Sequence, residues 1–592
     1  MIARKPRITS HGERGKPVCD RSILWVILAI AVLGLTMGCG AKQKEFKKPI
    51  DVDFDMADIP EPKEHGPSQY YDFIDRTFFK ETGRLLNLNQ RIGPPKQSIN
   101  VDAFEQVPNS SWFTNRNGRQ RMSLEEIRRG PNRNDGPADG TWTVVRGKTQ
   151  GVTPGFTIED PRGDRYIIKF DPKENPEMST AAEIISSKLF YAMGYNTTEN
   201  TLVSFTHDQL IVDRDAKIVD PLGNKRLMTE DDLTLLLNRV ARQDDGTYRA
   251  VASKFLDGVP KGPYSYYGTR KDDPNDIIRH EHRRDLRGLR IMAAWLEHND
   301  VRRINSLDMY VTEDSRSFMR HYLIDFGATL GSASLFPNLP SEGHEYQFDT
   351  YETLKSLFTF GIYKRRWLDA QEVEYPSVGY YESELFNPAN WKPNYPIPAF
   401  QRMTNLDAFW AAKIVMSFTD EQIRAAVEMG GLTNEAAENY LVKTIAERRD
   451  KIGRYWYAQV NPLDRFVLVE SMDGQRLQFD DLELDAGFAA RNATTYRYQL
   501  VYHGCDGEDD VIEEQVLAPD DVANGLPLDP DFAEDAVSRR GEEGCARRFY
   551  VALQVKRDPE LGEWGKWVRV YMDVIGNDND ALFDLIGIER QE

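Results

Sequence analysis

The stretch that decides the fold is HNDVRRIN, residues 298–305, together with IDFG, residues 324–327. The first follows a helical pattern over residues 285–297, where apolar positions recur at helical spacing. The second ends a pair of strand-like pieces, residues 308–311 and 321–324. The pattern therefore predicts a helix, a polar loop, two strands and a second polar loop in succession.

Two further features precede these stretches in the chain. Residues 142–172 alternate like paired strands, which puts Lys169 on a strand. A helix is expected next, with Thr180 as its N-cap, Glu183 three residues later, and Gly194 as its stop. The strand lysine and the helix glutamate thus come before the two polar loops, in that order.

In this order the four features resemble the protein-kinase-like superfamily. Residues 298–305 match its catalytic-loop pattern H-x-D-x-x-x-x-N, and residues 325–327 match its D-F-G. The resemblance covers roughly residues 100–460 and is closer to the atypical branches: HipA-like, phosphoinositide-kinase-like or secretory-pathway kinases. It implies an α+β fold with a strand-rich N-lobe and a helical C-lobe. Residues 465–592 lie outside it, and their alternating segments predict a C-terminal β-sandwich-like domain.

The resemblance also implies roles for single residues, since phosphoryl transfer depends mainly on positioned charge. Lys169 would hold the phosphates of ATP or another nucleotide, and Glu183 would orient it. Asp300 would accept the proton of the attacking hydroxyl. Asn305 and Asp325 would bind Mg²⁺, which prefers oxygen ligands. The resemblance implies a catalytic set of Asp300, Asn305 and Lys169, and nucleotide-binding residues Lys169, Glu183, Gly147 and Gly151.

Each residue also has an ordinary structural interpretation. Glu183 is explained by a capping box with Thr180, and Lys169 by a strand edge. His298 would suit the end of a helix, whereas in the kinase-like interpretation it braces the catalytic loop. Asn305 could cap the turn before a strand. The shared order and spacing of the four features favour the kinase-like interpretation over these separate ones.

Two departures from the family pattern leave the activity open. The expected nucleotide-covering loop, GKTQGVTPG at residues 147–155, has glycines too widely spaced for G-x-G-x-x-G. No A-P-E element follows Gly327. An active phosphotransferase, acting on a hydroxyl of a protein, lipid or saccharide, and an inactive pseudokinase-like binding lipoprotein are both consistent with this. A third possibility is a structural envelope lipoprotein whose late β-domain binds a partner.

The N-terminus predicts export. Basic residues precede an apolar run, residues 23–37, which ends just before Cys39. This resembles a bacterial lipoprotein signal, which implies lipidation of Cys39; a plain signal anchor is the alternative. Either one predicts a protein tethered to a membrane of the cell envelope, on its periplasmic face or at the cell surface. In an exported chain, Cys505 and Cys545 are expected to form a disulfide.

The length and charge of the chain limit the number of domains and the classes of partner. A chain of 592 residues is too long for one core. Lys and Arg total 75 against 94 Asp and Glu, and the net charge of −19 argues against a nucleic-acid partner. The expected organisation is a signal or anchor (1–39), a tether and extension (40–100), an N-lobe (101–258), a C-lobe (259–464) and a β-rich domain (465–592).

One other polar cluster contains residue types that can bind a metal. His280, Glu281, His282 and Arg283 lie close in sequence to Asp273 and Asp276. A metal site is one interpretation, and a solvated charged turn at the start of a helix is the more ordinary one. The nine histidines contain no HExxH pattern.

Overall fold

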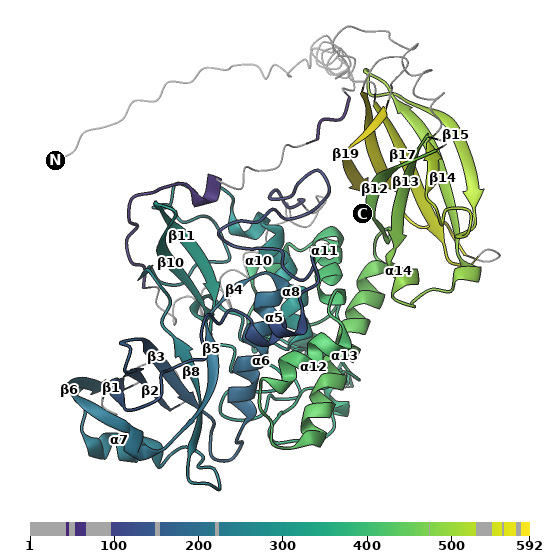
Figure 1. The fold of residues 1–592 in the computed structure, drawn as a ribbon. Helices are drawn as coiled ribbons and strands as arrows, with labels where there is room; N and C mark the ends of the chain where they lie inside the picture. Colours follow the sequence, from purple (N-terminus) through teal and green to yellow (C-terminus); the bar gives the residue numbers. More distant parts are fainter. Residues whose placement is uncertain are drawn as a thin grey trace, which may run out of the picture.

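The structure is a computed structural model that describes residues 43–46, 54–66, 96–147, 154–219, 224–360, 362–472, 474–528, 548–558, 562–575 and 582–592. Three predicted features lie outside the described residues: the signal with Cys39, Gly151 and Cys545. The predicted disulfide therefore stays a prediction. Figure 1 shows a strand-rich part, a helical part and a C-terminal β-rich part in chain order.

The strand-rich part is a seven-stranded sheet in the order β5-β8-β3-β2-β1-β6-β7. Neighbouring strands are antiparallel except β1 and β6, which run parallel. Val144, Phe156 and Ile168 alternate with more exposed residues and are fully buried on one face. The strands are β1 (Trp142–Gly147), β2 (Gly155–Glu159), β3 (Arg165–Phe170), β5 (Asn200–Phe205), β6 (Leu210–Val219), β7 (Lys225–Leu227) and β8 (Tyr248–Lys254).

Helix α6 (Met178–Met193) lies between this sheet and the helices of the second part, and almost all of its residues are buried. It contacts β3 and β8 on one side and α5 and α12 on the other. A small helix, α7 (Glu230–Leu237), packs on β6. Because α6 is enclosed by both parts, a side chain on it can meet groups from either one.

The predicted cap of α6 is wrong. The helix begins at Met178, with Glu177 as N-cap, so Thr180 lies inside it. The carboxylate of Asp171, from the end of β3, accepts hydrogen bonds from the backbone nitrogen and the hydroxyl of Thr180. A residue from the neighbouring strand therefore satisfies the helix start, and Glu183 is not needed for capping. The predicted stop is confirmed, since Gly194 is the C-cap.

A second, four-stranded sheet lies beside the first and has the order β4-β11-β10-β9. Its centre is the predicted pair of strands, which form an antiparallel hairpin with Ser306 opposite Leu323. The strands are β4 (Asn196–Thr197), β9 (Val259–Pro260), β10 (Ser306–Glu313) and β11 (Arg316–Leu323).

The helical part is built around buried Trp295 and Trp410. The capping box predicted for Thr419 and Gln422 is confirmed at the start of α12. The helices are α5 (Leu124–Arg129), α8 (Arg284–Trp295), α9 (Thr350–Phe358), α10 (Pro398–Gln401), α11 (Asn405–Met416), α12 (Asp420–Glu428), α13 (Glu435–Tyr457) and α14 (Leu482–Asp485). Short 3₁₀ turns are η1 (Phe54–Met56), η3 (His207–Gln209), η4 (His280–His282), η5 (Arg303–Asn305), η6 (Arg366–Asp369) and η7 (Arg491–Ala493).

The C-terminal part has a three-stranded sheet, β12-β13-β16, and a five-stranded sheet, β15-β14-β17-β18-β19. Leu477 of the first and Val551 of the second belong to one hydrophobic core, so the two sheets form a sandwich. The strands are β12 (Leu463–Ser471), β13 (Gly474–Asp481), β14 (Thr495–His503), β15 (Asp509–Leu517), β16 (Leu526–Leu528), β17 (Arg548–Lys556), β18 (Val568–Ile575) and β19 (Leu582–Arg590).

The predicted fold class is confirmed: an α+β chain with a strand-rich lobe, a helical lobe and a β-sandwich-like C-terminal part. The part of the chain that the structure describes contains no helix that is both long and apolar enough to span a bilayer.

The cluster at residues 280–283 is not a solvated turn. His280 and Glu281 are fully buried. The ring of His280 is bonded to Asp276 at 2.7 Å, and Glu281 pairs with Arg279 at 2.7 Å. Within the described residues, no three His, Cys, Asp or Glu side chains are arranged to hold a metal. Within the chain, His280 is therefore satisfied by Asp276 and Glu281 by Arg279.

Candidate active site

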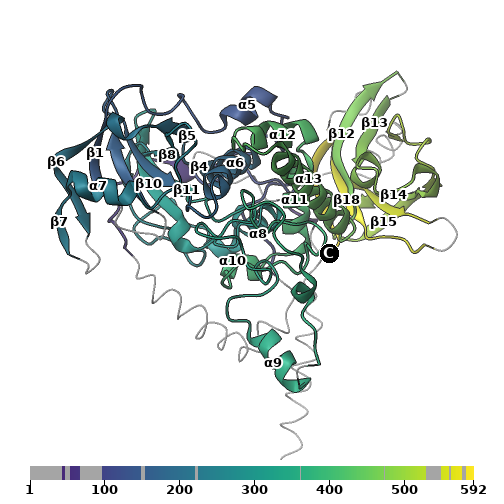
Figure 2. The same ribbon diagram turned by 90° about the horizontal axis from the view of Figure 1, so that it is seen from below.

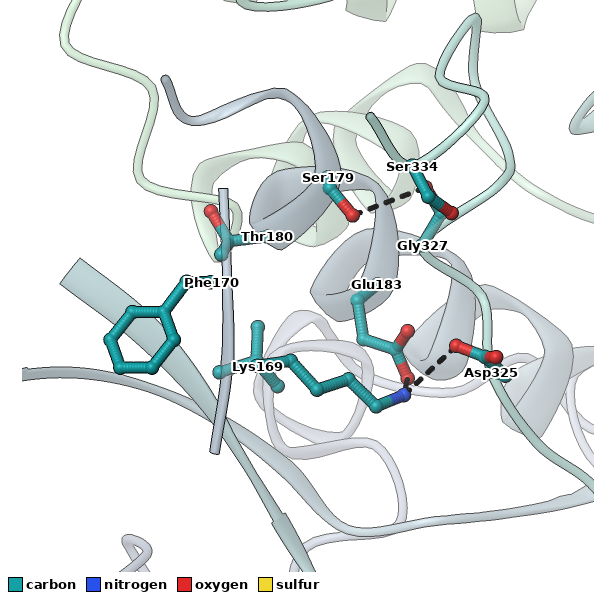
Figure 3. A pocket seen from close by; sticks show the side chains of 9 residues that line it. Lys169, Phe170, Ser179, Thr180, Glu183, Asp325, Gly327 and Ser334 are labelled. Atoms are coloured by element: carbon teal, nitrogen blue, oxygen red, sulfur yellow. Dashed lines mark hydrogen bonds and ion pairs between the residues drawn. The ribbon is translucent and has the colours of Figure 1, made fainter. Parts of the chain in front are cut away.

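The strand lysine and the two predicted carboxylates meet in one pocket. The Lys169 ammonium lies 3.2 Å from Glu183 Oε1 and 3.0 Å from Asp325 Oδ1. Figure 3 shows the three side chains converging from β3, from α6 and from the loop after β11. Glu183 is almost fully buried, whereas the side chain of Asp325 is 56% exposed and reaches the pocket opening. The structure thus brings together residues that lie far apart in sequence.

The pKa of Lys169 reflects this enclosure. Burial alone would lower it, but the carboxylates of Asp325 and Glu183 outweigh burial and raise it above its ordinary value. Lys169 is therefore positively charged at neutral pH. One ammonium faces two carboxyl groups, and burial raises the pKa of Glu183 although the charge of Lys169 acts in the opposite direction.

Asp325 is placed by an unusual backbone conformation and a buried neighbour. Its φ of 65° lies in the left-handed region that non-glycine residues seldom adopt. The next residue, Phe326, is fully buried and stacks on Phe190 of α6 with ring centroids 5.1 Å apart. The packing of Phe326 thus fixes the loop while the Asp325 side chain turns toward the pocket.

The predicted catalytic loop forms a tight cluster of hydrogen bonds. The side-chain amide of Asn305 donates to the main-chain oxygen of Asp300 at 2.7 Å and to its carboxylate at 2.9 Å. Because the side-chain nitrogen of Asn305 donates to Asp300, its amide oxygen is the atom that can bind a metal ion. Arg302 forms an ion pair with both oxygens of the same carboxylate, including a bond of 2.8 Å to Oδ2.

Burial raises the pKa of Asp300 above its ordinary value, although Arg302 and Asn305 act in the opposite direction. The nearby carboxylate of Asp325 contributes to the increase. Asp300 is thereby a stronger proton acceptor than an exposed aspartate, as a general base requires.

The β10–β11 hairpin brings the two polar loops together. Its first and last residues, Ser306 and Leu323, are paired. One step beyond them, the backbone nitrogen of Ile324 donates to the backbone oxygen of Asn305 at 3.0 Å. Asn305 and Asp325 therefore leave the same end of one hairpin, which explains why the two motifs are separated by two strands in the sequence.

A small pocket surrounds the Lys169 ammonium. The start of α6 contributes to its wall, where the Ser179 hydroxyl donates to the main-chain oxygen of Gly327 at 3.3 Å (Figure 3). A residue with a side chain would be crowded at position 327, since a Cβ built on Gly327 would lie 2.8 Å from Ser179 Oγ. The residues that line the pocket are Lys169, Phe170, Ser179, Thr180, Glu183, Val251, Asp325, Gly327 and Ser334.

Of the two glycines expected in the nucleotide-covering loop, the structure describes Gly147. It ends β1, opposite Phe156, and a Cβ built on it would lie 2.8 Å from Ile218. Close strand packing therefore explains this glycine. Gly151 lies outside the described residues, and its expected role stays a prediction.

His298 supports the loop from within the core. It is fully buried beside Phe190 and Phe326, with ring centroids 5.7 Å from each. Burial lowers the pKa of His298 to about 4, so the ring is neutral at pH 7. This agrees with the bracing position expected from the sequence.

The oxygen donors near the pocket fit a magnesium–nucleotide complex better than a metal held by protein alone. The described residues hold no site with three protein ligands of the His, Cys, Asp or Glu type. Magnesium commonly takes one or two protein oxygens and completes its shell with water and phosphate oxygens. Asp325 and Asn305 can supply those two protein oxygens.

A second pocket lies next to the catalytic loop and contains three acidic side chains. Glu342, Glu297 and Glu382 line it together with Arg448, which pairs with Glu297 at 2.5 Å. With the Asn338 amide oriented to suit its neighbours, its nitrogen donates to Glu342 at 2.7 Å. Its oxygen then accepts from the Asn299 side chain at 3.2 Å, one residue before Asp300.

Burial raises the pKa of Glu342 to about 7, and the carboxylate of Glu297 adds to the shift. A carboxyl group next to the catalytic loop therefore titrates near neutral pH.

Sequence reasoning missed Arg302. It lies inside the quoted motif at an unspecified position, two residues after Asp300, so its positive charge was the available signal. Its guanidinium pairs with Asp300 and also interacts electrostatically with Asp325. Ser179 and Ser334 were missed too, because only the folded chain brings them to the pocket.

Comparisons with known proteins contribute little beyond this geometry. No protein-family model matches the chain, and no curated protein matches it in sequence. Two solved structures are similar at 11% identity: a Golgi casein kinase and the Golgi casein kinase with Mn/ADP bound. The first match covers 69% of this chain and 95% of that chain with a TM-score of 0.28. The second covers 68% and 95% with a TM-score of 0.22. TM-scores this low do not support an inference about fold or function, so the function is inferred from the site itself.

Proposed function

We propose that this protein is a phosphotransferase that moves a phosphoryl group from a magnesium–nucleotide complex to a hydroxyl group. The observation that carries the proposal is the convergence of Lys169, Glu183 and Asp325 in one pocket. Asn305 and Asp325 leave the same hairpin end, and Asn305 is bonded to Asp300. A buried lysine between two acids, beside an aspartate of raised pKa, supplies the charges that phosphoryl transfer needs.

Each side chain has a task that its contacts support. Lys169, held by Glu183, would pair with nucleotide phosphates. Asp325 and Asn305 would hold Mg²⁺, which neutralises phosphate charge when bound. Asp300 would accept the proton of the acceptor hydroxyl, and Arg302 would stabilise negative charge on the transferred group. These tasks require no side chain from outside the pocket and its catalytic loop.

A pseudokinase-like binding function is the second candidate, and one observation favours it. Both oxygens of Asp300 are engaged by Arg302, and one of them also accepts from Asn305. A carboxylate held in this way can form a structural ion pair with Arg302 instead of accepting a proton. In that case the pocket would bind nucleotide and metal without turnover.

We also propose, from the sequence, that the protein is exported and tethered to a membrane by lipid on Cys39 or by the apolar run before it. The acceptor hydroxyl would then belong to an envelope protein, lipid or saccharide. Labelling cells with a radioactive fatty acid, and repeating this with Cys39→Ala, tests the lipid anchor. Loss of label in the variant is expected, and equal label would contradict lipidation at this residue.

Nucleotide binding is the first test of the site. Thermal unfolding of the full chain should shift upward with ATP and Mg²⁺ together, and less with ATP alone. Asp325→Ala should abolish the magnesium-dependent part, because it removes the metal carboxylate. The control is Asp257→Ala, an exposed carboxylate on the same lobe, 74% exposed, which should leave the shift unchanged. No shift in the unmodified chain would argue against both candidates.

Phosphoryl transfer separates the two candidates. Envelope fractions are incubated with γ-labelled ATP and the full chain, and the label on protein, lipid and saccharide is counted. An active enzyme transfers label, and Asp300→Ala lowers transfer at least about 100-fold, the size typical of a lost general base. Nucleotide binding with no transfer to any fraction would support the pseudokinase-like function instead.

A further inference from the structure

A cluster of strongly exposed apolar side chains lies on and just after α9. This region, residues 350–360 and 362–368, is here called the α9 protrusion. A soluble surface normally shows such residues singly, so a cluster of them needs an explanation. Their exposed fractions are 64% for Tyr351, 66% for Leu357, 75% for Phe358, 94% for Phe360, 87% for Ile362 and 55% for Leu368.

The protrusion stands away from the rest of the molecule. Figure 2 shows α9 projecting beyond α8 and α10, on the side of the helical part away from α12. Its base is held firmly: Glu345 bonds Arg365 at 2.7 Å and Trp367 Nε1 at 2.8 Å. A fixed base with an apolar tip directed outward suits insertion into a partner better than packing against this chain.

The charge of the protrusion is opposite to that of the protein. Between residue 350 and residue 369, where η6 ends, there are four basic side chains and two acidic side chains, Glu352 and Asp369, a net charge of 4 − 2 = +2. Ion pairs join Lys355 to Glu352 and Lys364 to Asp369. The whole chain has a net charge of −19. A partner surface that attracts the protrusion is therefore negatively charged. The basic residues are Lys355, Lys364, Arg365 and Arg366.

The mixture of groups is that of a membrane interface. The Lys355 ammonium lies 4.3 Å from the ring centroid of Tyr351 and 5.0 Å from that of Tyr363. Aromatic rings with lysines alongside are enriched where lipid tails meet headgroups. A protein interface is usually flatter, with lysine depleted from its centre. Phe360 and Ile362, almost fully exposed, suit shallow burial among acyl chains instead.

We propose that the α9 protrusion inserts into the surface of an anionic lipid bilayer. Phe358, Phe360 and Ile362 enter the boundary between headgroups and acyl chains. Lys355, Lys364 and Arg366 contact anionic headgroups, while Arg365 stays paired with Glu345 at the base. The chain that follows the protrusion later reaches the catalytic loop, where the backbone nitrogen of Asn394 donates to the backbone oxygen of Asn299 at 2.9 Å. Insertion of the protrusion would hold the catalytic loop with Asp300 in a fixed orientation above the bilayer.

Hydrogen exchange on vesicles tests the insertion. The full chain is reconstituted through its own N-terminus into vesicles of phosphatidylcholine alone or of phosphatidylcholine with phosphatidylglycerol. Amide exchange of residues 350–368 is then compared between the two. We expect exchange at least about fivefold slower on the anionic vesicles, and no difference at α7. Phe358→Ser with Phe360→Ser and Ile362→Ser should abolish the protection.

The control variant carries serine at Ile211, Leu227 and Leu235, which are 55%, 56% and 64% exposed on the strand-rich part. It should keep the full protection of the protrusion. Both variants alter exposed residues, so unchanged thermal unfolding confirms that they fold. Equal exchange on neutral and anionic vesicles would overturn the proposal. So would protection that increases with protein concentration on both, because that result indicates contact between two copies of the chain.

Discussion

At the scale of single residues, Lys169 determines how the pocket is held together. It is the cation between Glu183 and Asp325, and Glu183 is almost fully buried. The side-chain amide of Asn200 also donates to Glu183, at 3.1 Å. If the lysine is lost, a buried carboxylate keeps neutral partners, Asn200 and the backbone of Gly327, but loses its cation.

Lys169→Met should therefore lower the free energy of unfolding by roughly 3 kcal/mol, the usual cost of breaking a buried ion pair from one side. Urea unfolding measures it. The control is Lys254→Met on the adjacent strand, whose ammonium is 3.0 Å from a single, partly exposed carboxylate, Asp164. That change should cost about 1 kcal/mol or less. Replacing Glu183 by Leu in the Lys169→Met background should recover part of the loss, and no recovery would contradict the pairing.

Glu342 should make stability depend on pH. Its pKa rises from an ordinary 4.5 to about 7 on folding, because burial disfavours the charged form. Between these values the folded protein keeps a proton that the unfolded chain has lost, so stability falls as pH increases from 4.5 to 7. In Glu342→Gln this fall should be smaller by up to about 3 kcal/mol, since one pKa unit corresponds to 1.36 kcal/mol.

Urea unfolding at pH 4.5, 6 and 8 measures the difference between variant and unmodified protein. Glu384→Gln, at an exposed position nearby, serves as the control and should follow the unmodified protein. A Glu342→Gln curve parallel to that of the unmodified protein would show that this carboxyl does not titrate in the window.

At the scale of elements, α6 joins the two lobes and its end is as important as its start. The helix ends at Gly194, whose φ of 130° suits glycine alone. A Cβ added there would lie 2.3 Å from the ring of Phe113, which is itself fully buried. Neither the backbone nor the ring can move without disturbing the core.

Gly194→Ala should thus destabilise the protein by about 2 kcal/mol or more, by combining backbone strain with overpacking. Gly163→Ala separates the two causes, because Gly163 also has positive φ, 84°, but has nothing within 4 Å of the added Cβ. It should cost about 1 kcal/mol. Chemical unfolding compares the two, and equal losses would mean that the contact with Phe113 contributes nothing.

At the scale of the whole molecule, the last strand ties the β-sandwich to the helical part. The fully buried guanidinium of Arg590 donates to the main-chain oxygen of Leu463 at 2.6 Å and pairs with Asp464 at 2.7 Å. It also pairs with Glu105. Lys413 of α11 reaches the same Asp464 at 2.7 Å. Burial would raise the pKa of Asp464, but Lys413 and Arg590 outweigh it and lower the pKa.

Arg590→Met should therefore weaken the coupling between the two parts and cost about 3 to 5 kcal/mol. We expect unfolding to change from one transition to two, with the sandwich separated from the lobes. Circular dichroism and tryptophan fluorescence, followed together in urea, measure this. Arg569→Met, which removes a partly exposed pair with Glu589 at 3.3 Å, is the control and should keep one transition. A single transition in both would contradict the coupling.

Much of the fold could be predicted from local patterns. The strand around Lys169, the hairpin before Asp325, the capping box of α12 and the helix stop at Gly194 all depend on neighbours within a few residues. Such patterns act through backbone propensity, alternation and hydrogen bonds to nearby groups, which the sequence states directly. The order of Lys169, Glu183, Asp300, Asn305 and Asp325 was visible for the same reason.

Contacts between distant segments could not be read in this way. Thr180 looked like a helix cap because the carboxylate of Asp171, which replaces that cap, comes from a separate strand. The exposure of Phe360 and the burial of His280 also depend on which elements pack nearby.

The sequence by itself therefore determined the elements and the chemical types of the site residues. The tertiary structure alone decided which of them meet. It set Lys169 between two acids, added Arg302 to Asp300, and left the α9 protrusion exposed. The physical reason is that these outcomes depend on strand register and on packing between parts of the chain, and no short stretch of residues specifies either.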